Sequence, residues 1–344
     1  MINTIIDNDL NEIKDRVKEA EFFQNKSFLV TGGAGFLGSW ICNSLIRFGA
    51  SVTCQDNFSS GLKANIDHLV KNEKFSFFEG DIRNITPETS FDGIFHFASR
   101  ASPDDYNIHQ VETLLTNAEG MKNVLDLAQK NDCFCLYSST SEIYGDAKVI
   151  PTPEQYWGNV NSLGERSCYD EGKRYGEALC MSYKREYKTK IKIVRIFNTF
   201  GPRIRPDGPY GRALSRFVLQ ALNNEDIVIY GDGKQTRSFC YVTDTVSGIL
   251  SFAALGTNVD VINIGNEKEL TINDLAKIII KKTNSKSKII HKEKMPDDPK
   301  RRKPDISLAR KVLKWEPKTT FDLGLKKTID WISENKDSFS ELKC

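Results

Sequence analysis

The fold is decided by Phe28-Leu29-Val30-Thr31-Gly32-Gly33-Ala34-Gly35-Phe36-Leu37-Gly38. An apolar run with β-branched residues ends at a cluster of glycines, and apolar side chains at helical spacing follow it. This order predicts a strand, a tight turn and a helix. Gly32, Gly35 and Gly38 would let the backbone turn sharply, approach a pyrophosphate and pack the helix onto the strand. Because a helix N-terminus attracts anions, we interpret the stretch as the phosphate-binding turn of a dinucleotide fold.

A second feature further along the chain supports this interpretation. A predicted strand over 50–55 ends in Asp56. A dinucleotide fold places the acid that binds its ribose about 20 residues beyond the glycines. Glycines alone are weak evidence because ordinary turns are rich in them, so the strand and the acid supply the needed context.

The bulk composition is that of an ordinary globular protein. The chain has 344 residues, of which 39% are hydrophobic and 27% charged, and its formal net charge is +2. So small a charge gives no reason to expect nucleic acid or an anionic membrane as a partner. No apolar stretch approaches the roughly 20 residues of a membrane span, and the N-terminus lacks the order of a signal peptide.

The cysteines and histidines do not form a metal-binding pattern. The eight cysteines are scattered and there are only four histidines, so no metal-ligand spacing emerges. We expect reduced thiols, no bound metal and a cytoplasmic location. The run Lys300-Arg301-Arg302-Lys303 is either a solvated loop or a contact for a phosphorylated ligand.

Strand and helix patterns alternate through the first 200 residues. Strands are predicted over 27–31, 50–55, 74–79, 92–97, 132–138 and 190–196, with a returning strand near 260–264. This alternation predicts an α/β fold, a Rossmann doubly wound parallel sheet with helices on both faces. A smaller C-terminal mixed α/β region is expected to bind substrate. We expect a helical extension over 1–26, a dinucleotide-binding domain over 27–200 with a returning strand within 240–265, and a mainly substrate-binding domain over 201–335. The extension is predicted as an amphipathic helix from about residue 8 to 23.

One helical segment carries a pair of residues with acid–base chemistry. Tyr169 and Lys173 are four residues apart, so a helix would place both side chains on one face. An ammonium beside a phenol stabilises the phenolate and would lower the tyrosine pKa from about 10. Such a tyrosine can remove the proton of a sugar hydroxyl while hydride leaves the same carbon.

A hydroxyl-rich stretch follows the predicted strand over 132–138. Thr140 could hydrogen-bond a reacting substrate oxygen, and Ser141 and Glu142 would face the same cleft. The plainer interpretation is a polar turn that caps the next element.

Together these features resemble the extended short-chain dehydrogenase/reductase (NAD-dependent epimerase/dehydratase) family, and within it most closely the UDP-glucuronate decarboxylases. The resemblance covers about residues 26–331. Its most specific segments are 101–103, 139–146, 156–161, 166–174, 195–203, 231–239 and 297–305.

The resemblance implies a reaction cycle without net redox change. Tyr169 would remove the 4-hydroxyl proton as C4 gives hydride to tightly bound NAD. The 4-keto sugar is a β-keto acid, so its carboxylate can leave as carbon dioxide, with Thr140 polarising the ketone. Glu142 and Arg237 are the candidate acids for reprotonation at C5. Return of the hydride would yield a nucleotide-linked pentose for polysaccharide biosynthesis.

Two other outcomes share the first oxidation. The 4,6-dehydratases carry Asp-Glu where this chain has Ser141-Glu142, and a serine is too weak an acid for their dehydration step. A 4-epimerase of the UDP-glucuronate or UDP-glucose type stays open as the alternative. A nucleotide-sensing protein without activity is disfavoured, because Tyr169 and Lys173 are both present.

The resemblance also implies the binding residues. An acid at Asp56 would repel the extra phosphate of NADP, which favours NAD as the cofactor. A UDP-sugar is the expected substrate, and a homodimer packed through helices near 107–130 and 169–188 is the expected assembly. The expected cofactor-binding residues are Gly32, Gly35, Phe36, Leu37, Gly38, Asp56, Asn57, Phe58, Asp81, Ile82, Ala98, Ser99, Tyr169 and Lys173. The expected substrate-binding residues are Asn198, Arg212, Tyr230 and Arg237.

The sequence departs from the decarboxylase pattern at two places. Arg100 stands where those enzymes commonly have proline. The loop from Ile204 to Arg212 is about two residues longer than theirs. Both changes fall near the expected sugar end of the site.

Overall fold

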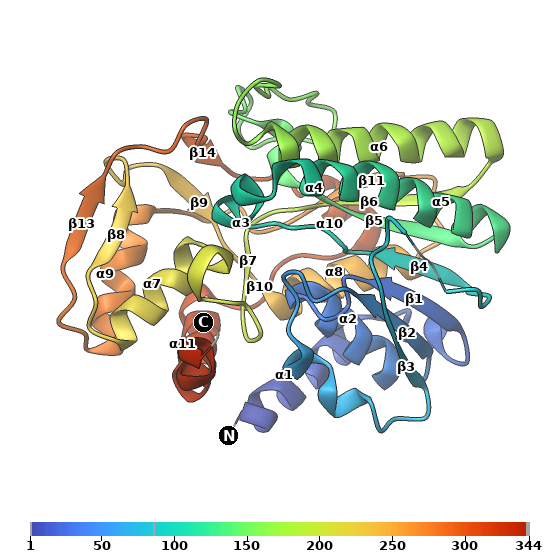
Figure 1. Cartoon of the computed structure of the whole chain (residues 1–344), viewed down its shortest axis with the longest axis horizontal. Helices are drawn as coiled ribbons and strands as arrows, with labels where there is room; N and C mark the ends of the chain where they lie inside the picture. Colours follow the sequence, from blue (N-terminus) through green and yellow to red (C-terminus); the bar gives the residue numbers. More distant parts are fainter. Residues whose placement is uncertain (1, 85–86, 342–344) are drawn as a thin grey trace.

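The computed structural model describes residues 2–84 and 87–341, and its centre is a seven-stranded sheet (Figure 1). The spatial order is β11-β6-β5-β4-β1-β2-β3, and all neighbouring strands are parallel. The order reverses between β1 and β4, where open α/β sheets bind their ligands. The predicted doubly wound parallel sheet is thus confirmed. Its strands are β1 (Ser27–Thr31), β2 (Ser51–Asp56), β3 (Phe75–Glu79), β4 (Gly93–His96), β5 (Phe134–Thr140), β6 (Lys190–Ile196) and β11 (Val261–Ile264).

Strand β5 lies two residues further along the chain than predicted. Every residue of β5 is buried, because helices cover this central strand on both faces. The burial continues to Thr140, which is therefore the last residue of the strand and not part of the following loop.

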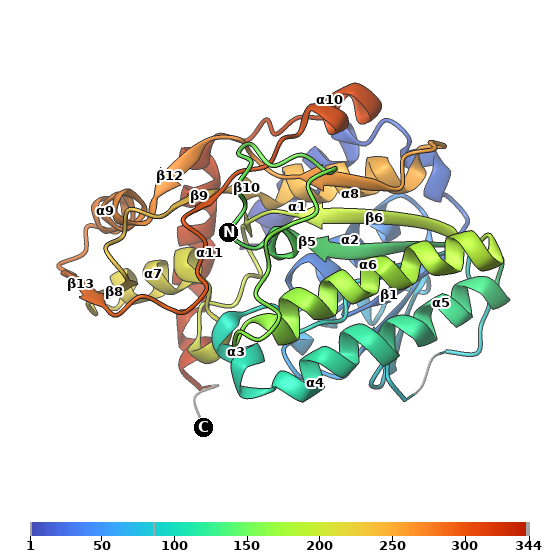
Figure 2. The ribbon, with the colours of Figure 1, turned by 90° about the horizontal axis from the view of Figure 1, so that it is seen from above.

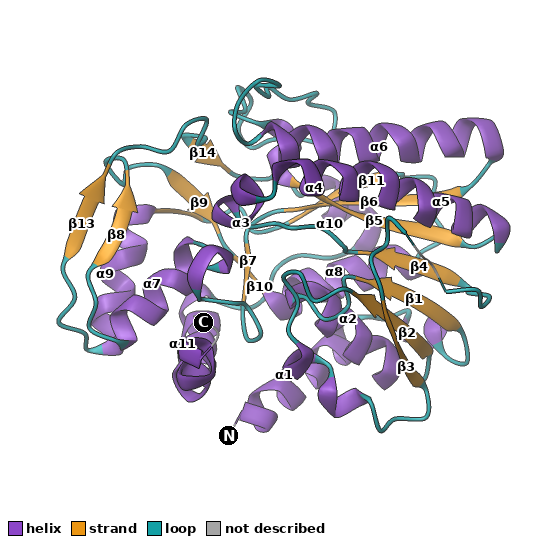
Figure 3. Ribbon diagram, viewed as in Figure 1, coloured by secondary structure: helices purple, strands orange, loops and turns teal. Residues whose placement is uncertain are grey.

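Helices cover both faces of the sheet (Figure 3). One face carries α4 (Gln110–Leu115), α5 (Met121–Lys130) and α6 (Ser167–Tyr187), with the short α3 (Pro103–Ile108) ahead of them. The other face carries α2 (Phe36–Arg47) and α8 (Val242–Ala254), with α10 (Ser307–Leu313) packed by β11.

The N-terminal helix ends earlier than predicted. Helix α1 spans Ile2–Arg16, and a separate 3₁₀ turn follows over Ala20–Phe23. The chain turns between them, and Phe23 enters the core against Phe28, with ring centroids 5.6 Å apart.

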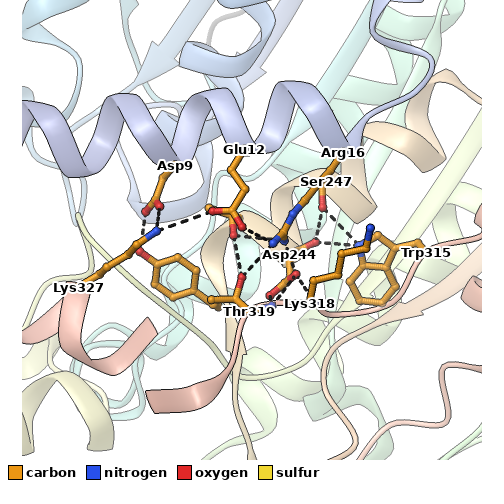
Figure 4. Close-up of polar contacts among 11 residues, drawn as sticks. Asp9, Glu12, Arg16, Asp244, Ser247, Trp315, Lys318, Thr319 and Lys327 are labelled. Carbon is orange, nitrogen blue, oxygen red and sulfur yellow. Dashed lines mark hydrogen bonds and ion pairs between the residues drawn. The ribbon is translucent and has the colours of Figure 1, made fainter. Parts of the chain in front are cut away.

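Buried charges hold α1 against two other helices (Figure 4). Asp9 is fully buried; it forms an ion pair with Lys327 and accepts a hydrogen bond of 2.5 Å from the Tyr241 hydroxyl. Arg16 forms an ion pair with Asp244 at the start of α8. Since Lys327 belongs to α11 (Phe321–Glu341), these ion pairs join α1, the first helix, to α8 and to the last helix.

A smaller region follows residue 200 in the chain and lies beside the sheet. The arrowheads of β5 and β6 point toward this region in Figure 2, so it faces the carboxyl ends of the strands. The region includes α7 (Ala213–Leu222), α9 (Ile272–Thr283) and α11. Its paired strands are β7 (Thr199–Phe200) with β10 (Cys240–Tyr241), β8 (Ile227–Tyr230) with β13 (Ile289–Lys292), and β9 (Thr236–Ser238) between β12 (Glu269–Thr271) and β14 (Arg301–Arg302). None of the described helices is both long and apolar enough to cross a bilayer.

Candidate active site

A cavity of about 410 Å³ is lined by residues of the sheet's carboxyl edge and of the smaller region. Its size is within the range of small-molecule sites. Nearly all the residues that the sequence nominated line it: Gly32, Gly35, Phe36, Leu37, Gly38, Asp56, Asn57, Asp81, Ile82, Ala98, Ser99, Thr140, Ser141, Glu142, Tyr169, Lys173, Asn198, Arg212, Tyr230 and Arg237.

Phe58 is the exception among the nominated residues. Its ring packs against Phe77 with centroids 5.2 Å apart, so it is held by an aromatic contact outside the cavity lining. Its backbone N–H donates to Asp56 Oδ1 at 2.8 Å. Phe58 is therefore not among the residues that line the cavity; its backbone supports Asp56, and its contact with the cofactor stays a prediction.

The glycine turn is packed too closely for larger residues. Gly32 has φ +67°, and a Cβ on it would lie 2.6 Å from the backbone N of Ala98. Helix α2 begins at Phe36, and its N-cap Gly35 offers no side-chain cap to the first turn. The first N–H groups of α2 are thus left for an anion, which fits the pyrophosphate of a dinucleotide.

Asp56 ends β2 beside this turn. Its carboxylate accepts hydrogen bonds from the backbone N–H of Ala34 at 2.9 Å and of Phe58 at 2.8 Å. Burial raises the pKa of Asp56, and these backbone donors oppose the rise. An acid so fixed at the cavity wall can bind ribose hydroxyls, so the residues present fit NAD. No group of three His, Cys, Asp or Glu side chains within residues 2–84 and 87–341 is placed to hold a metal ion.

Tyr169 and Lys173 lie one turn apart on α6, both buried. Lys173 Nζ lies 5.9 Å from the Tyr169 ring centroid and donates to the Ser138 carbonyl at 2.9 Å. Burial lowers the pKa of Lys173 to about 7. Burial also raises the pKa of Tyr169 to about 12; the Arg212 guanidinium is the main group opposing this rise, aided by a hydrogen bond with Thr140.

The raised pKa of Tyr169 is opposite in direction to the pKa shift that the sequence predicted for it. The sequence predicted a phenol pKa below its ordinary value because of the Lys173 ammonium. In the structure desolvation outweighs the neighbouring charges, because the phenolate loses its hydration when buried. The cation that most favours the phenolate is Arg212, from the smaller region.

Glu142 is surrounded by guanidinium groups. It follows Thr140, whose Oγ1 accepts a hydrogen bond of 3.2 Å from the Glu142 N–H. The Glu142 carboxylate forms ion pairs with Arg166 and Arg302. Burial alone would raise the pKa of Glu142, but Arg302, Arg166 and Arg237 outweigh it and lower this pKa to about 2. A group that stays ionised in this way is a poor proton donor, which argues against Glu142 as the predicted acid.

Arg237, the other candidate acid, belongs to β9. It forms an ion pair of 2.7 Å with Asp298 and donates to the Pro299 carbonyl at 2.9 Å. Burial lowers the pKa of Arg237, and its ion pair with Asp298 opposes this shift.

The sequence reasoning did not nominate Arg166, Asp170 or Arg302. The first clue to Arg302 was the basic run at 300–303. In strand β14 its two arginines differ: Arg301 is exposed and pairs with Glu269, whereas Arg302 is buried against Glu142. Asp170 lies 3.8 Å from Arg166, and burial, aided by the charge of Glu142, raises its pKa to about 7.

The expected substrate-binding residues lie at four places in the fold, of which Arg237 in β9 is described above. Asn198 follows β6, and within the described chain its buried amide nitrogen has no hydrogen-bond partner. Arg212 precedes α7, while Tyr230 ends β8 with the Arg216 guanidinium 5.6 Å from its ring centroid.

The fold and the site together define a Rossmann-type protein with a dinucleotide-binding turn and a Tyr–Lys pair in one cavity. Residues 28–265 match the NAD dependent epimerase/dehydratase family, and the chain belongs to this family. NAD is accordingly its cofactor.

The chain is similar to several curated proteins over most of its length. It is 43% identical over 308 residues to UDP-glucuronic acid decarboxylase 1 of Xenopus tropicalis, covering 89% of this chain and 72% of that protein. It is 42% identical over 311 residues to UDP-glucuronic acid decarboxylase 3 of Arabidopsis thaliana, covering 90% of each.

Solved structures of related enzymes share the fold. The UDP-glucuronic acid 4-epimerase of Bacillus cereus, in complex with UDP-glucuronic acid and NAD, matches with a TM-score of 0.80 and 29% identity over 90% of this chain and 99% of that one. The dTDP-glucose 4,6-dehydratase of Streptomyces venezuelae, with NAD bound, matches with a TM-score of 0.85 and 26% identity. The match covers 92% of this chain and 100% of that one.

Proposed function

We propose that this enzyme decarboxylates UDP-glucuronate to UDP-xylose through a transient 4-keto sugar, with NAD regenerated in every turnover. The observation that carries the proposal is the cluster of Arg166, Arg237 and Arg302 around Glu142 in the cavity that also holds Tyr169. Guanidinium groups suit a sugar carboxylate because they bind it with two parallel hydrogen bonds. The identity of 42–44% to enzymes named UDP-glucuronic acid decarboxylase supports the same substrate.

The first step is proton removal from the 4-hydroxyl by Tyr169. Bound NAD supplies the hydride acceptor for C4 and later returns the hydride. Thr140 and Arg212 stabilise the phenolate of Tyr169, so a phenolate can form despite the burial and accept the proton of the 4-hydroxyl. Lys173 fixes the face of α6 that carries Tyr169, because its ammonium donates a hydrogen bond to the Ser138 carbonyl near the end of β5.

Loss of carbon dioxide then follows from the chemistry of a β-keto acid. Electrons of the breaking bond flow into the C4 ketone, whose oxygen Thr140 and Tyr169 stabilise by hydrogen bonds. Of the two acids considered for reprotonation at C5, Glu142 stays ionised and so has no proton to donate; Arg237 stays the candidate. We assign to Glu142 the task of positioning Arg166 and Arg302.

The direct test is incubation of the purified protein with UDP-glucuronate. Release of carbon dioxide with a product lighter by that mass supports the proposal. An isomer of unchanged mass supports the 4-epimerase, which the matched epimerase structure with bound UDP-glucuronic acid keeps as the second candidate. Tyr169→Phe should abolish turnover while leaving NAD bound; turnover at the wild-type rate would exclude the tyrosine from this role.

The division of the chain follows from the same proposal. We assign NAD binding to residues 27–200, with a returning strand from within 240–265, and sugar binding mainly to 201–335. The helical extension over 1–26 supports both parts, since α1 bonds to α8 and α11.

A homodimer through α4 and α6 is part of the proposal. Val111 of α4 is 72% exposed, and Leu114 of α4 and Tyr175 of α6 are also exposed; Ile108, at the end of the adjoining α3, is 68% exposed. A second copy of the chain would cover these apolar side chains. Light scattering should give a dimer for the wild type and a monomer for Val111→Asp; a monomeric wild type would contradict this assembly.

The cellular role is also proposed. A cytoplasmic location fits the described cysteines, all of which are free and buried. A nucleotide-linked pentose is an activated glycosyl donor, so we place the enzyme before a glycosyl-transfer step of polysaccharide biosynthesis. Fractionation of the source cells would test the location.

A further inference from the structure

The two departures from the decarboxylase pattern meet at one place in the fold. Arg100 follows β4, and Tyr210 lies in the longer loop after Arg203. Both side chains donate to the same backbone carbonyl, that of Ser59: Arg100 Nη1 at 3.4 Å and the Tyr210 hydroxyl at 3.3 Å. Arg205, in the same longer loop, donates to the next carbonyl, that of Ser60, at 3.3 Å.

Each of these donors is held in position by further contacts. The Arg205 guanidinium lies 3.6 Å from the Tyr210 ring centroid, and its Nε donates to buried Asp207 at 3.0 Å. Arg100 is itself buried, and it pairs with Asp105 at 2.6 Å. The donors are therefore preorganised, and the bonds to Ser59 and Ser60 cost little side-chain entropy.

The acceptors belong to the loop that follows Asp56. Ser59 and Ser60 line the cavity on the side of the sheet, and Arg205 and Tyr210 line it from the smaller region. The hydrogen bonds thus connect the two walls of the cavity across about 150 residues of sequence. Opening the walls would break the bonds from Arg205 and Tyr210, while the bond from Arg100, which follows β4 in the same wall as Ser59, would remain.

We propose that Arg205 and Tyr210, with Arg100 holding the same loop from the side of the sheet, form a strap that fastens the loop after Asp56 to the smaller region and so retains NAD between turnovers. These are positioning residues, because they act on the cofactor through the loop. An enzyme that returns its hydride in each cycle gains from slow loss of the cofactor. The strap rests on NAD binding alone and holds whichever sugar reaction takes place.

The test measures exchange of NAD in the full-length protein without any sugar. Protein loaded with radiolabelled NAD is mixed with excess unlabelled NAD, and the label retained on the protein is followed with time. Tyr210→Phe removes one hydrogen bond and keeps the ring under Arg205, so we expect NAD exchange to be faster by a few fold. With Arg205→Lys added, exchange should be about 10-fold faster or more. The control is Arg185→Ala, an exposed arginine near the end of α6, which should exchange like the wild type.

Thermal denaturation separates the strap from a general loss of structure. We expect the midpoint of Tyr210→Phe to stay within about 2 °C of the wild type, since the hydroxyl makes one partly exposed bond. Exchange rates of both strap variants equal to that of the control would overturn the proposal. An unchanged exchange rate with a raised KM for the sugar would instead assign the loop to sugar binding, and would overturn the strap as well.

Discussion

The rings of Tyr106 and Tyr169 are stacked almost parallel, with their centroids 5.1 Å apart and an angle of 3° between their planes. Tyr106 comes from α3 and Tyr169 from α6, and both are buried. Within the described chain the Tyr106 hydroxyl has no hydrogen-bond partner. The contribution of Tyr106 is therefore its ring, which fixes the plane in which the Tyr169 phenol lies.

Replacement of Tyr106 should separate this stacking role from any polar role. Tyr106→Ala removes the ring and lets Tyr169 rotate, so we expect kcat to fall by about 10-fold or more, since small misplacements of a reacting group are costly. Tyr106→Phe keeps the ring and loses only an unpaired hydroxyl, so its kcat should match the wild type. Steady-state kinetics with UDP-glucuronate would measure both. A full kcat in the alanine variant would show that Tyr169 is oriented by other contacts.

The glycine turn offers a prediction about NAD binding. A Cβ at Gly38 would lie 2.1 Å from the carbonyl oxygen of Gly32. Gly38→Ala should therefore displace the turn from the start of α2 and weaken NAD binding by about 10-fold or more. Gly256→Ala is the matched control, because its Cβ would meet nothing within 4 Å. Calorimetric titration with NAD measures both variants, and equal affinities would contradict the assignment of this turn.

The charge state of Tyr169 gives a prediction about pH. Because Arg212 is the main group that opposes the raised pKa of Tyr169, Arg212→Gln should raise this pKa further. The phenolate is the proton acceptor, so the rising limb of kcat/KM against pH should move to higher pH in Arg212→Gln. Lys173→Met should move that limb less. If the limb moved further in Lys173→Met than in Arg212→Gln, Lys173 would be the main group that lowers the pKa of Tyr169, as the sequence predicted.

The parts of the fold that depend on local chemistry could be predicted from the sequence. Strands β1 and β6 have the predicted bounds, because short apolar runs between turn residues identify buried strands. The glycine turn and the spacing of Tyr169 and Lys173 are likewise local patterns. The early end of α1 was missed, because it depends on how Phe23 packs in the core, against Phe28 of β1 and against Phe95 of β4, which is 72 residues further along the chain.

The charges of the site could not be predicted in this way. Arg166 and Arg302 are 24 and 160 residues from Glu142 in sequence, so no spacing rule brings them together. Desolvation is equally invisible in a sequence, because it depends on how the whole chain covers a group. For this reason the spacing correctly predicted that Tyr169 and Lys173 share one helix, whereas the predicted direction of the Tyr169 pKa shift was wrong.

Glu142 provides a prediction about stability and pH. Its pKa is lowered to about 2 in the folded protein by the surrounding arginines, whereas an unfolded chain has the ordinary value of about 4.3. Between these values the unfolded chain binds more protons, so the stabilisation by Glu142 is present above pH 4.3 and is lost as the pH falls toward 2. Glu142→Gln leaves the buried guanidinium groups without their carboxylate, and should lower the free energy of unfolding at pH 7 by about 3 kcal/mol.

The wild type and Glu142→Gln should differ less in their free energy of unfolding as the pH falls below 4.3, because the wild type then loses its ionised carboxylate. Urea unfolding at several pH values between 3 and 7 would measure this difference. The control is Glu73→Gln, since Glu73 is exposed, and its free energy of unfolding should stay within about 0.5 kcal/mol of the wild type throughout. If the difference for Glu142→Gln stayed constant with pH, the variant would be acting through packing, and the low pKa of Glu142 would be wrong.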